Sequence, residues 1–359
     1  FLYNAYLGRA IEVSQFGLVS LLGSFWYLSH IPLGALQRTV VHRSAFLLGT
    51  YKTPIKAFWK TVRATAVKLS LIVAGLWLVS IPLLANFFHA DSILPFVLFT
   101  PVWFFGLAFA VDSGFLSGNL KFATLAIVIV IESLSKLAIS VVLVELGFAQ
   151  WVYAAIPASL FIAFLIAWFA VRKLKVVPAA DDKKITLHFP KRFFTTSILT
   201  SLSTIAFLSF DVILAKHYLP PREAGEYALL SLVGKMIFFF GSLFSQFVNP
   251  LVSRAEGAGK SSKQLFYRFL LAAITVSLLV FVVVGIFGSV SIPILLGSAA
   301  QPILPFLPIY GMAMVNFTIA ASIVIYHQAR REYLFAVLSF LLTLAQVGGI
   351  AVFHEDIQS

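Results

Sequence analysis

The stretches SILPFVLFTPVWFFGLAFAV (92–111) and PILPFLPIYGMAMVNFTIAA (302–321) share the tetrapeptide ILPF and decide how this chain folds. Each has twenty residues and no charged side chain, which is the length and character of a helix that crosses a bilayer. Over the whole chain, 60% of the residues are hydrophobic and 11% are charged, against about half and a quarter in an ordinary soluble domain. We therefore predict an all-α polytopic membrane protein.

Apolar runs bounded by charged or turn residues predict ten membrane spans after a helical stub at residues 1–8. The run TVSLLVFVVVGIFGS (275–289) is apolar on every side, which differs from the alternating pattern of a membrane β-strand. The predicted spans lie near residues 17–40, 64–88, 93–116, 121–145, 150–171, 194–218, 226–250, 266–289, 302–326 and 333–353.

Basic residues gather on one side of this predicted topology. Of the 26 Lys and Arg residues, 21 fall in the loops and flanks that follow every second helix, if the stub is counted as the first. Because short cytoplasmic loops retain Lys and Arg, we predict that the even-numbered helices end in the cytoplasm. The net charge of +12 is then a consequence of topology. We expect no nucleic-acid partner, since the basic residues form no soluble basic domain.

The two ILPF copies belong to an ordered series of matches between the halves of the chain. The offsets stay between 208 and 213 residues. The matching pairs are FG (16–17) with AG (224–225), LVSLLG (18–23) with LLSLVG (229–234), RSA (43–45) with SRA (253–255), and LKFA (120–123) with YLFA (333–336). Such a series predicts a duplication of six helices. Six is even, so the repeat is parallel, with a pseudo-two-fold axis along the membrane normal.

The duplication predicts two six-helix bundles. The N-terminal bundle is expected at 1–171 and the C-terminal bundle at 194–359. A basic linker at 172–193, which contains RKLKVVPAADDKKITLHFPKR (172–192), is expected to join them. The linker is interpreted as a cytoplasmic tether or as a lipid-sensing segment. By symmetry the first bundle lacks most of its first helix and the second lacks its last. We therefore expect about twelve or more transmembrane helices in the native protein and a sequence truncated at both ends.

The loops that open each half carry a family resemblance. YNAYLGRAIEVSQFGLVSLL (3–22) and FDVILAKHYLPPREAGEYALLSLVGKMIFF (210–239) resemble the polysaccharide transporter family, the O-antigen-type flippases of the multidrug/oligosaccharidyl-lipid/polysaccharide exporter superfamily. The resemblance implies a flippase of the bacterial inner membrane that moves an undecaprenyl-diphosphate-linked oligosaccharide to the outer leaflet by alternating access. Its partners would be the lipid-linked oligosaccharide, membrane lipids, a coupling cation (proton or sodium) and glycan polymerase machinery.

Two other transport functions stay open at this stage, a cation-coupled multidrug extruder and a flippase for another lipid headgroup such as peptidoglycan precursor. An enzyme is not expected. The chain has no GxxxxGK[ST] loop, which argues against a transport ATPase. The outer loops are short, which argues against a glycan polymerase or ligase. No cofactor or metal site is predicted, because the seven histidines lack ligand spacing.

Charged residues inside predicted spans are the candidate site residues, since a charge at membrane depth is costly unless it faces protein or a water-filled cavity. Lys235 has no partner one turn away on its own helix. A lone ammonium facing a cavity would attract a diphosphate, and the alternative is snorkelling to the outer interface. Glu132 and Lys136 are four residues apart, as in a self-neutralised helical ion pair, or both line the cavity. We predict that Lys235 and Lys136 face the space between the halves.

Four further charges are candidates for coupling or gating. Asp112 is the coupling-ion candidate, with a water-exposed position near the helix end as the alternative. Asp211 lies close to Lys216 and is interpreted as part of an outer interface cluster or gate. Arg9 and Lys216 precede the corresponding FG and AG turns of the two halves, where they would serve as gate residues or cap helix ends.

Overall fold

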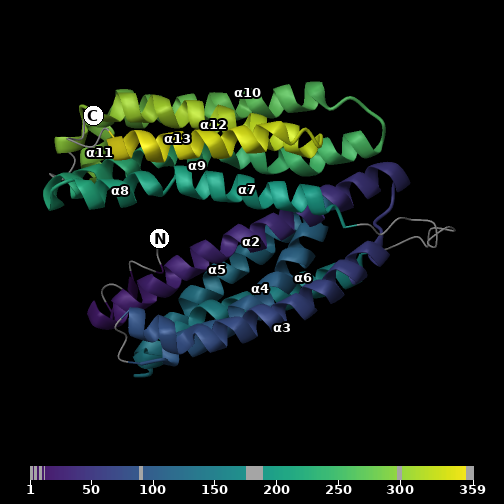
Figure 1. Ribbon diagram of the computed structural model, residues 1–359, viewed down its shortest axis with the longest axis horizontal. Helices are drawn as coiled ribbons and strands as arrows, with labels where there is room; N and C mark the ends of the chain where they lie inside the picture. Colours follow the sequence, from purple (N-terminus) through teal and green to yellow (C-terminus); the bar gives the residue numbers. More distant parts are fainter. Residues whose placement is uncertain are drawn as a thin grey trace. The chain divides into compact units, whose positions relative to one another are not determined.

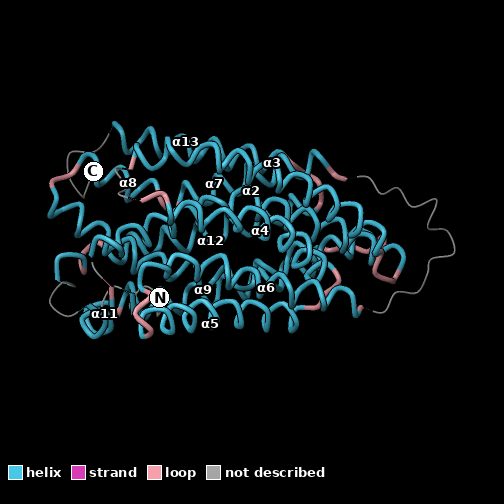
Figure 2. The backbone as a smooth tube through the Cα atoms, turned by 90° about the horizontal axis from the view of Figure 1, so that it is seen from below, coloured by secondary structure: helices cyan, strands magenta, loops and turns pink. Residues whose placement is uncertain are grey.

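The computed structural model describes residues 13–88, 92–174, 189–296 and 301–352, together with residues 3, 6, 7, 10 and 11. Every element in these described residues is helical (Figure 2). Eight helical segments among them are long and apolar enough to cross a membrane. The prediction of an all-α polytopic membrane protein is confirmed. Most of the predicted linker, residues 175–188, lies outside the described residues.

The chain divides into two compact units, Phe1–Phe194 and Thr195–Ser359, whose helices are labelled in Figure 1. The N-terminal unit is organised around one helix, α4, against which α2, α3, α5 and α6 all pack. Every residue of α4 from Ala110 to Gly118 is buried. The helices of this unit are α2 (Val13–Tyr51), α3 (Lys56–Phe87), α4 (Leu94–Gly118), α5 (Phe122–Glu145), the short 3₁₀ helix η1 (Ala149–Ala154) and α6 (Ala155–Lys173).

Small residues allow α4 to lie very close to α2. Gly114 and Gly118 are four residues apart and therefore share one face of α4, as in the GxxxG pattern of membrane helix pairs. A Cβ atom at Gly114 would lie 2.7 Å from the carbonyl oxygen of Gln37, and one at Gly118 would lie 2.8 Å from that of Val41. Because these neighbours are backbone atoms, they cannot move aside as a flexible side chain would. The close packing of α2 on α4 requires glycine at both positions.

The C-terminal unit is built on α9, which packs against α8, α10 and α12. Helix α13 packs against α8 and α12. Helix α7 is rich in Ser and Thr, and its Ser197 accepts a hydrogen bond of 2.9 Å from Gln328 of α12. The helices of this part of the chain are α7 (Lys191–Phe207), α8 (Phe210–Tyr218), α9 (Pro221–Gly257), α10 (Lys263–Phe281), the π-helical turn η2 (Val282–Ile286), α11 (Gly288–Leu296), α12 (Leu307–Ala329) and α13 (Leu334–Val352).

Two predicted spans are interrupted in the structure. The span predicted at 194–218 is divided into α7 and α8 by a break at Leu208 and Ser209. The span predicted at 266–289 changes from α10 to a π-helical turn, in which the Phe287 N–H donates to the Val282 carbonyl. The Val283 carbonyl, which Phe287 would have used in an α-helix, accepts a bond of 2.7 Å from the Ser291 hydroxyl. Apolar length alone did not reveal either interruption.

The helices α4 and α12 end in the same hydrogen-bonded turn. In each case, three successive N–H groups close the helix, and donors and acceptors are shifted by 211 residues between the two. After α4, the N–H groups of Asn119, Leu120 and Lys121 donate to the carbonyls of Phe115, Ser117 and Leu116, respectively. After α12, the N–H groups of Arg330, Arg331 and Glu332 donate to the carbonyls of Tyr326, Gln328 and His327, respectively. Leu120 and Arg331 both have left-handed backbone angles, with φ of 59° and 66°, which side chains other than glycine seldom adopt. The shift of 211 lies within the range of offsets of the sequence matches.

The repeated motifs themselves sit differently in the two halves. Pro95 is the second residue of α4, in the first turn, as the sequence predicted. Pro305 was expected in the same place but precedes α12, whose first turn holds Pro308 instead. The FG and AG pairs, predicted as turns, are helical and lie in α2 and α9. The FG and AG expectations were wrong because α2 and α9 begin several residues before the apolar run, and the Pro305 expectation was wrong because α12 begins five residues after the predicted start at 302.

The contact between α2 and α4 gives a direct test of the fold. We expect Gly114→Ala to lower the stability of the protein by about 1–3 kcal/mol, the usual cost of overpacking. The matched control is Gly75→Ala on α3, where an added Cβ has nothing within 4 Å and should raise helix stability by about 0.5–1 kcal/mol. Thermal unfolding in detergent measures both. A Gly114→Ala variant as stable as the wild type would contradict the close packing.

Candidate functional site

The break between α7 and α8 places a carboxylate inside the C-terminal unit. Asp211 is the second residue of α8, and only 4% of it is exposed. The first turn of a helix presents free N–H groups and a positive partial charge, which favour an acidic side chain there. Ser209 occupies the capping position without forming a side-chain cap. The buried carboxylate must therefore find its other partners on neighbouring helices.

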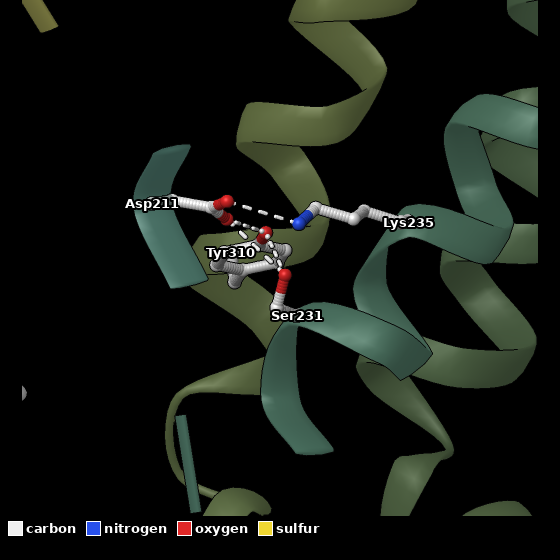
Figure 3. A network of polar contacts seen from close by, with 4 residues as sticks. All are labelled: Asp211, Ser231, Lys235 and Tyr310. Atoms are coloured by element: carbon white, nitrogen blue, oxygen red, sulfur yellow. Dashed lines mark hydrogen bonds and ion pairs between the residues drawn. The ribbon is translucent and has the colours of Figure 1, made fainter. Parts of the chain in front are cut away.

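Three side chains from α9 and α12 surround this carboxylate (Figure 3). The ammonium nitrogen of Lys235 lies 3.0 Å from Oδ1 of Asp211. The hydroxyls of Ser231 and Tyr310 lie 3.1 Å and 2.9 Å from Oδ2. The Tyr310 hydroxyl is also 3.1 Å from the Ser231 oxygen. We call Asp211, Ser231, Lys235 and Tyr310 the Asp211 network.

The local sequence explains how these groups meet. Ser231 and Lys235 are four residues apart on α9 and so share one face of that helix. Gly234, between them, leaves space for the ring of Tyr310, since a Cβ at Gly234 would lie 2.2 Å from the ring. Tyr227, one turn before Ser231, packs edge-on against the Tyr310 ring with centroids 6.2 Å apart. Glycine at 234 is thus a requirement of the network.

The Asp211 network corrects the view of Lys235 as a lone ammonium. Its partner is 24 residues earlier, on another helix, and the two side chains are 10% and 4% exposed. Transfer of both charges out of water is costly and is offset only by good geometry and further hydrogen bonds, which the two hydroxyls supply. The pair can open if another anion replaces Asp211 beside Lys235.

A second buried carboxylate lies in the N-terminal unit. Asp112 is fully buried, so the expectation of a water-exposed helix-end residue was wrong. Its Oδ1 accepts a bond of 2.7 Å from the indole N–H of Trp59, and its Oδ2 lies 3.5 Å from a guanidinium nitrogen of Arg63. The guanidinium carbon is 5.2 Å from the ring centroids of both Trp59 and Phe164. A coupling cation at Asp112 would have to displace Arg63.

Glu132 and Lys136 do not form the ion pair that their spacing indicated. Neither side chain has an ion-pair partner within 4.0 Å in the part of the chain that the structure describes, and both are partly exposed on α5. The Lys136 ammonium instead lies 5.2 Å from the ring centroid of Tyr3, within cation–π distance. The interpretation as a self-neutralised pair was wrong, and cavity lining stays a prediction.

The remaining candidates are placed only in part. Arg9 lies outside the described residues. Lys216 belongs to α8, five residues after Asp211, and its side chain lies outside the description as well. The expected grouping of Asp211 with Lys216 therefore stays a prediction. Among the described residues, no group of three His, Asp or Glu side chains could hold a metal ion.

The sequence did not indicate four of the residues that complete these clusters: Trp59, Arg63, Ser231 and Tyr310. For Ser231 a signal was present, because a hydroxyl one turn before an intramembrane Lys shares its face. Tyr310 lies four residues after the second ILPF copy, but nothing in the sequence points it toward α8. Arg63 was counted in the basic flank of a loop, because the predicted span began at residue 64. In the structure it lies within α3, which begins seven residues earlier, at Lys56.

Comparison with known proteins identifies the family. Residues 7–305 match the family described as polysaccharide biosynthesis protein. This match covers more than half of the chain, so the chain belongs to that family, and the resemblance that the sequence indicated is confirmed. No curated protein matches the chain significantly.

Solved structures identify the fold as that of the MATE transporters of the MOP superfamily. An outward-facing multidrug resistance MATE family transporter of that superfamily has a TM-score of 0.74 at 18% identity, covering 99% of this chain and 85% of its own. The eukaryotic MATE transporter AtDTX14 has a TM-score of 0.66 at 12% identity, covering 98% and 90%. A MATE structure in the straight conformation gives 0.71 at 15%, covering 97% and 82%. The chain thus combines a polysaccharide biosynthesis family with the fold of the MATE transporters.

The buried pair in the Asp211 network can be tested by a double-mutant cycle. Lys235→Met should lower stability by about 3–5 kcal/mol, because it leaves a buried carboxylate without its cation. The double variant Lys235→Met/Asp211→Asn should lose less than the single variant, since the uncompensated charge is gone. Thermal unfolding in detergent measures the coupling, with Lys263→Met on the exposed first turn of α10 as the control. Additive effects of the two substitutions would show that no pair exists.

Proposed function

We propose that this protein is a flippase that moves an undecaprenyl-diphosphate-linked oligosaccharide from the cytoplasmic to the outer leaflet of a bacterial inner membrane. The observation that carries the proposal is the combination of a polysaccharide biosynthesis family match over residues 7–305 with a MOP-superfamily transporter fold.

We further propose that the two halves arose by duplication and move as two bundles in alternating access. The turn that closes α4 recurs at the end of α12 with a shift of 211 residues, and both turns have a residue other than glycine, Leu120 or Arg331, in the left-handed position. The same turn closes α5 and α9 with glycine at that position, so it supports the proposal only together with the ordered sequence matches. In a parallel repeat, both bundles have the same orientation in the membrane. The asymmetric distribution of basic residues supports a cytoplasmic position for the loop after α4 and the loop after α12.

Lys235 is the proposed contact for the diphosphate. A diphosphate carries more negative charge than a carboxylate and would compete with Asp211 for the Lys235 ammonium. Ser231 and Tyr310 supply hydroxyl donors beside that ammonium. When Lys235 turns to the diphosphate, Asp211 is left buried and unpaired, which is costly for a charged carboxylate. Binding of the diphosphate would therefore be opposed by the cost of leaving Asp211 without its cation, which the two hydroxyls lower in part.

The decisive experiment replaces the native gene with variants and measures the distribution of lipid-linked sugars between the leaflets. Deletion should cause undecaprenyl-linked repeat units to accumulate in the cytoplasmic leaflet. Lys235→Ala should fail to reverse this accumulation, and Lys235→Arg should reverse it in part, because the charge is retained but the shape is not. Lys263→Ala should behave as wild type, since Lys263 is exposed on the first turn of α10.

A stability control separates transport from folding. The variant Lys235→Ala/Asp211→Asn removes the unpaired charge and should fold, yet it should not restore flipping. Full rescue by Lys235→Ala would contradict the assignment of Lys235. Unchanged lipid-linked sugars in the deletion strain would contradict the flippase itself.

The same strains test the second candidate, a cation-coupled multidrug extruder. Two observations favour that candidate over others: a multidrug resistance MATE transporter shares the fold, and the carboxylates Asp112 and Asp211 are both buried. An extruder predicts altered drug resistance with unchanged glycans. A peptidoglycan-precursor flippase predicts instead that cell-wall synthesis stops on depletion.

A further inference from the structure

A basic groove of about 840 Å³ lies on the N-terminal unit, between the first turns of α3 and the end of α6. Five cationic side chains line it: Lys56, Lys60, Arg63, Lys68 and Arg172. None of the described residues that line the groove is acidic. Among the described residues, the carboxylate in ion-pair contact with these cations is Asp112, which is buried and paired with Arg63. The described lining of the groove therefore carries an excess of positive charge.

The helical spacing of α3 builds the floor of the groove. Every fourth residue of α3 from position 56 to position 68 is a lysine, except at position 64, which is Ala64. The three lysines are Lys56, Lys60 and Lys68. These positions share one face of the helix and extend over about 18 Å of its length. Ala64 is exposed and its side chain is short, so the row of ammonium groups has an open space at its centre. A ligand with one compact anionic group fits this arrangement.

Aromatic rings and a backbone bond form the wall opposite. The Arg172 guanidinium carbon lies 4.0 Å from the ring centroid of Trp168, which holds the cation over the indole. The Lys56 ammonium donates a bond of 2.9 Å to the Arg172 carbonyl and so ties the start of α3 to the last turn of α6. The groove is thus a built feature of two helices and does not depend on a loop.

The depth of the groove in the membrane follows from the length of α3. The helix has 32 residues, well beyond the roughly 20 that cross the hydrocarbon core. The stretch 69–88, which begins directly after Lys68, has twenty residues and no charge. This stretch accounts for the hydrocarbon core, so Lys68 and Ala64 lie at the level of the headgroups, and the row continues past Lys60 toward the water. The indole of Trp168, which also lines the groove, suits that interfacial layer.

We propose that this groove binds the headgroup of an anionic phospholipid of the cytoplasmic leaflet. The phosphodiester lies over Ala64 between Lys60 and Lys68, and the acyl chains follow the apolar face of α3 past Leu71 and Ile72, each 61% exposed. Basic pockets at the cytoplasmic ends of membrane helices recognise such headgroups. The exposed apolar path that continues from the groove favours a membrane lipid over a free phosphate. This site is separate from the Asp211 network, which belongs to the other unit.

The test uses the purified full chain and measures lipid binding by native mass spectrometry, with phosphatidylglycerol against phosphatidylcholine as the probes. The wild type should retain phosphatidylglycerol in preference. Lys60→Gln/Lys68→Gln should bind phosphatidylglycerol about 30-fold more weakly, as expected for the loss of two basic residues near a lipid surface. The control Lys260→Gln/Lys263→Gln removes two exposed lysines elsewhere and should leave the preference unchanged.

A second variant keeps every charge and fills the space. Ala64→Leu should weaken phosphatidylglycerol binding while leaving the melting temperature in phosphatidylcholine near that of the wild type, because the side chain is exposed. Equal binding of both lipids by the wild type, or full phosphatidylglycerol binding by both groove variants, would overturn the proposal. Displacement of the lipid by inorganic phosphate alone would also overturn it, in favour of a free-anion site.

Discussion

A bilayer provides no water to satisfy a free N–H, C=O or charge, and this constraint governs the whole structure. It explains why every described element is a helix and why irregular backbone occurs only where protein can complete the bonding. The π-helical turn after α10 shows the rule in detail, since the Ser291 hydroxyl bonds the carbonyl that the turn releases. The break before α8 shows it for charge, because the carboxylate there is enclosed by a cation and two hydroxyls. Both of these departures from regular helix therefore coincide with buried polar contacts that neighbouring residues complete.

The sequence predicted the class of fold, the approximate spans and the family, because each depends on apolar length or on short ordered motifs. It did not predict the break at Leu208 and Ser209 or the position of Pro305 relative to α12. Both depend on how a backbone closes its hydrogen bonds against neighbours, which composition does not record. The ends of α2, α3 and α9 were also placed too close to the membrane, since a helix continues in water wherever packing supports it.

Intramembrane charges were easy to find and hard to pair. Lys235 was noted for having no neighbour on its own helix, yet its partner comes from α8. Glu132 and Lys136 had ideal helical spacing, yet no contact within 4.0 Å joins them among the described residues. Pairing between helices depends on rotation about each helix axis, and a single sequence carries no direct measure of that rotation. The two halves also differ here: an offset of 211 residues relates Asp112 to Ile323 and Lys235 to Ser24, so these charges do not recur at the corresponding positions of the proposed repeat.

The hydrogen bond from Lys56 to the Arg172 carbonyl can also transmit force between two helices. It joins the start of one long helix to the last turn of another, 116 residues apart in the chain. Force applied to the segment that follows α6 would be shared by α3 before it could unwind the end of α6. Such a pull would therefore reach α3 by two routes, through this bond and through α4, on which both helices pack.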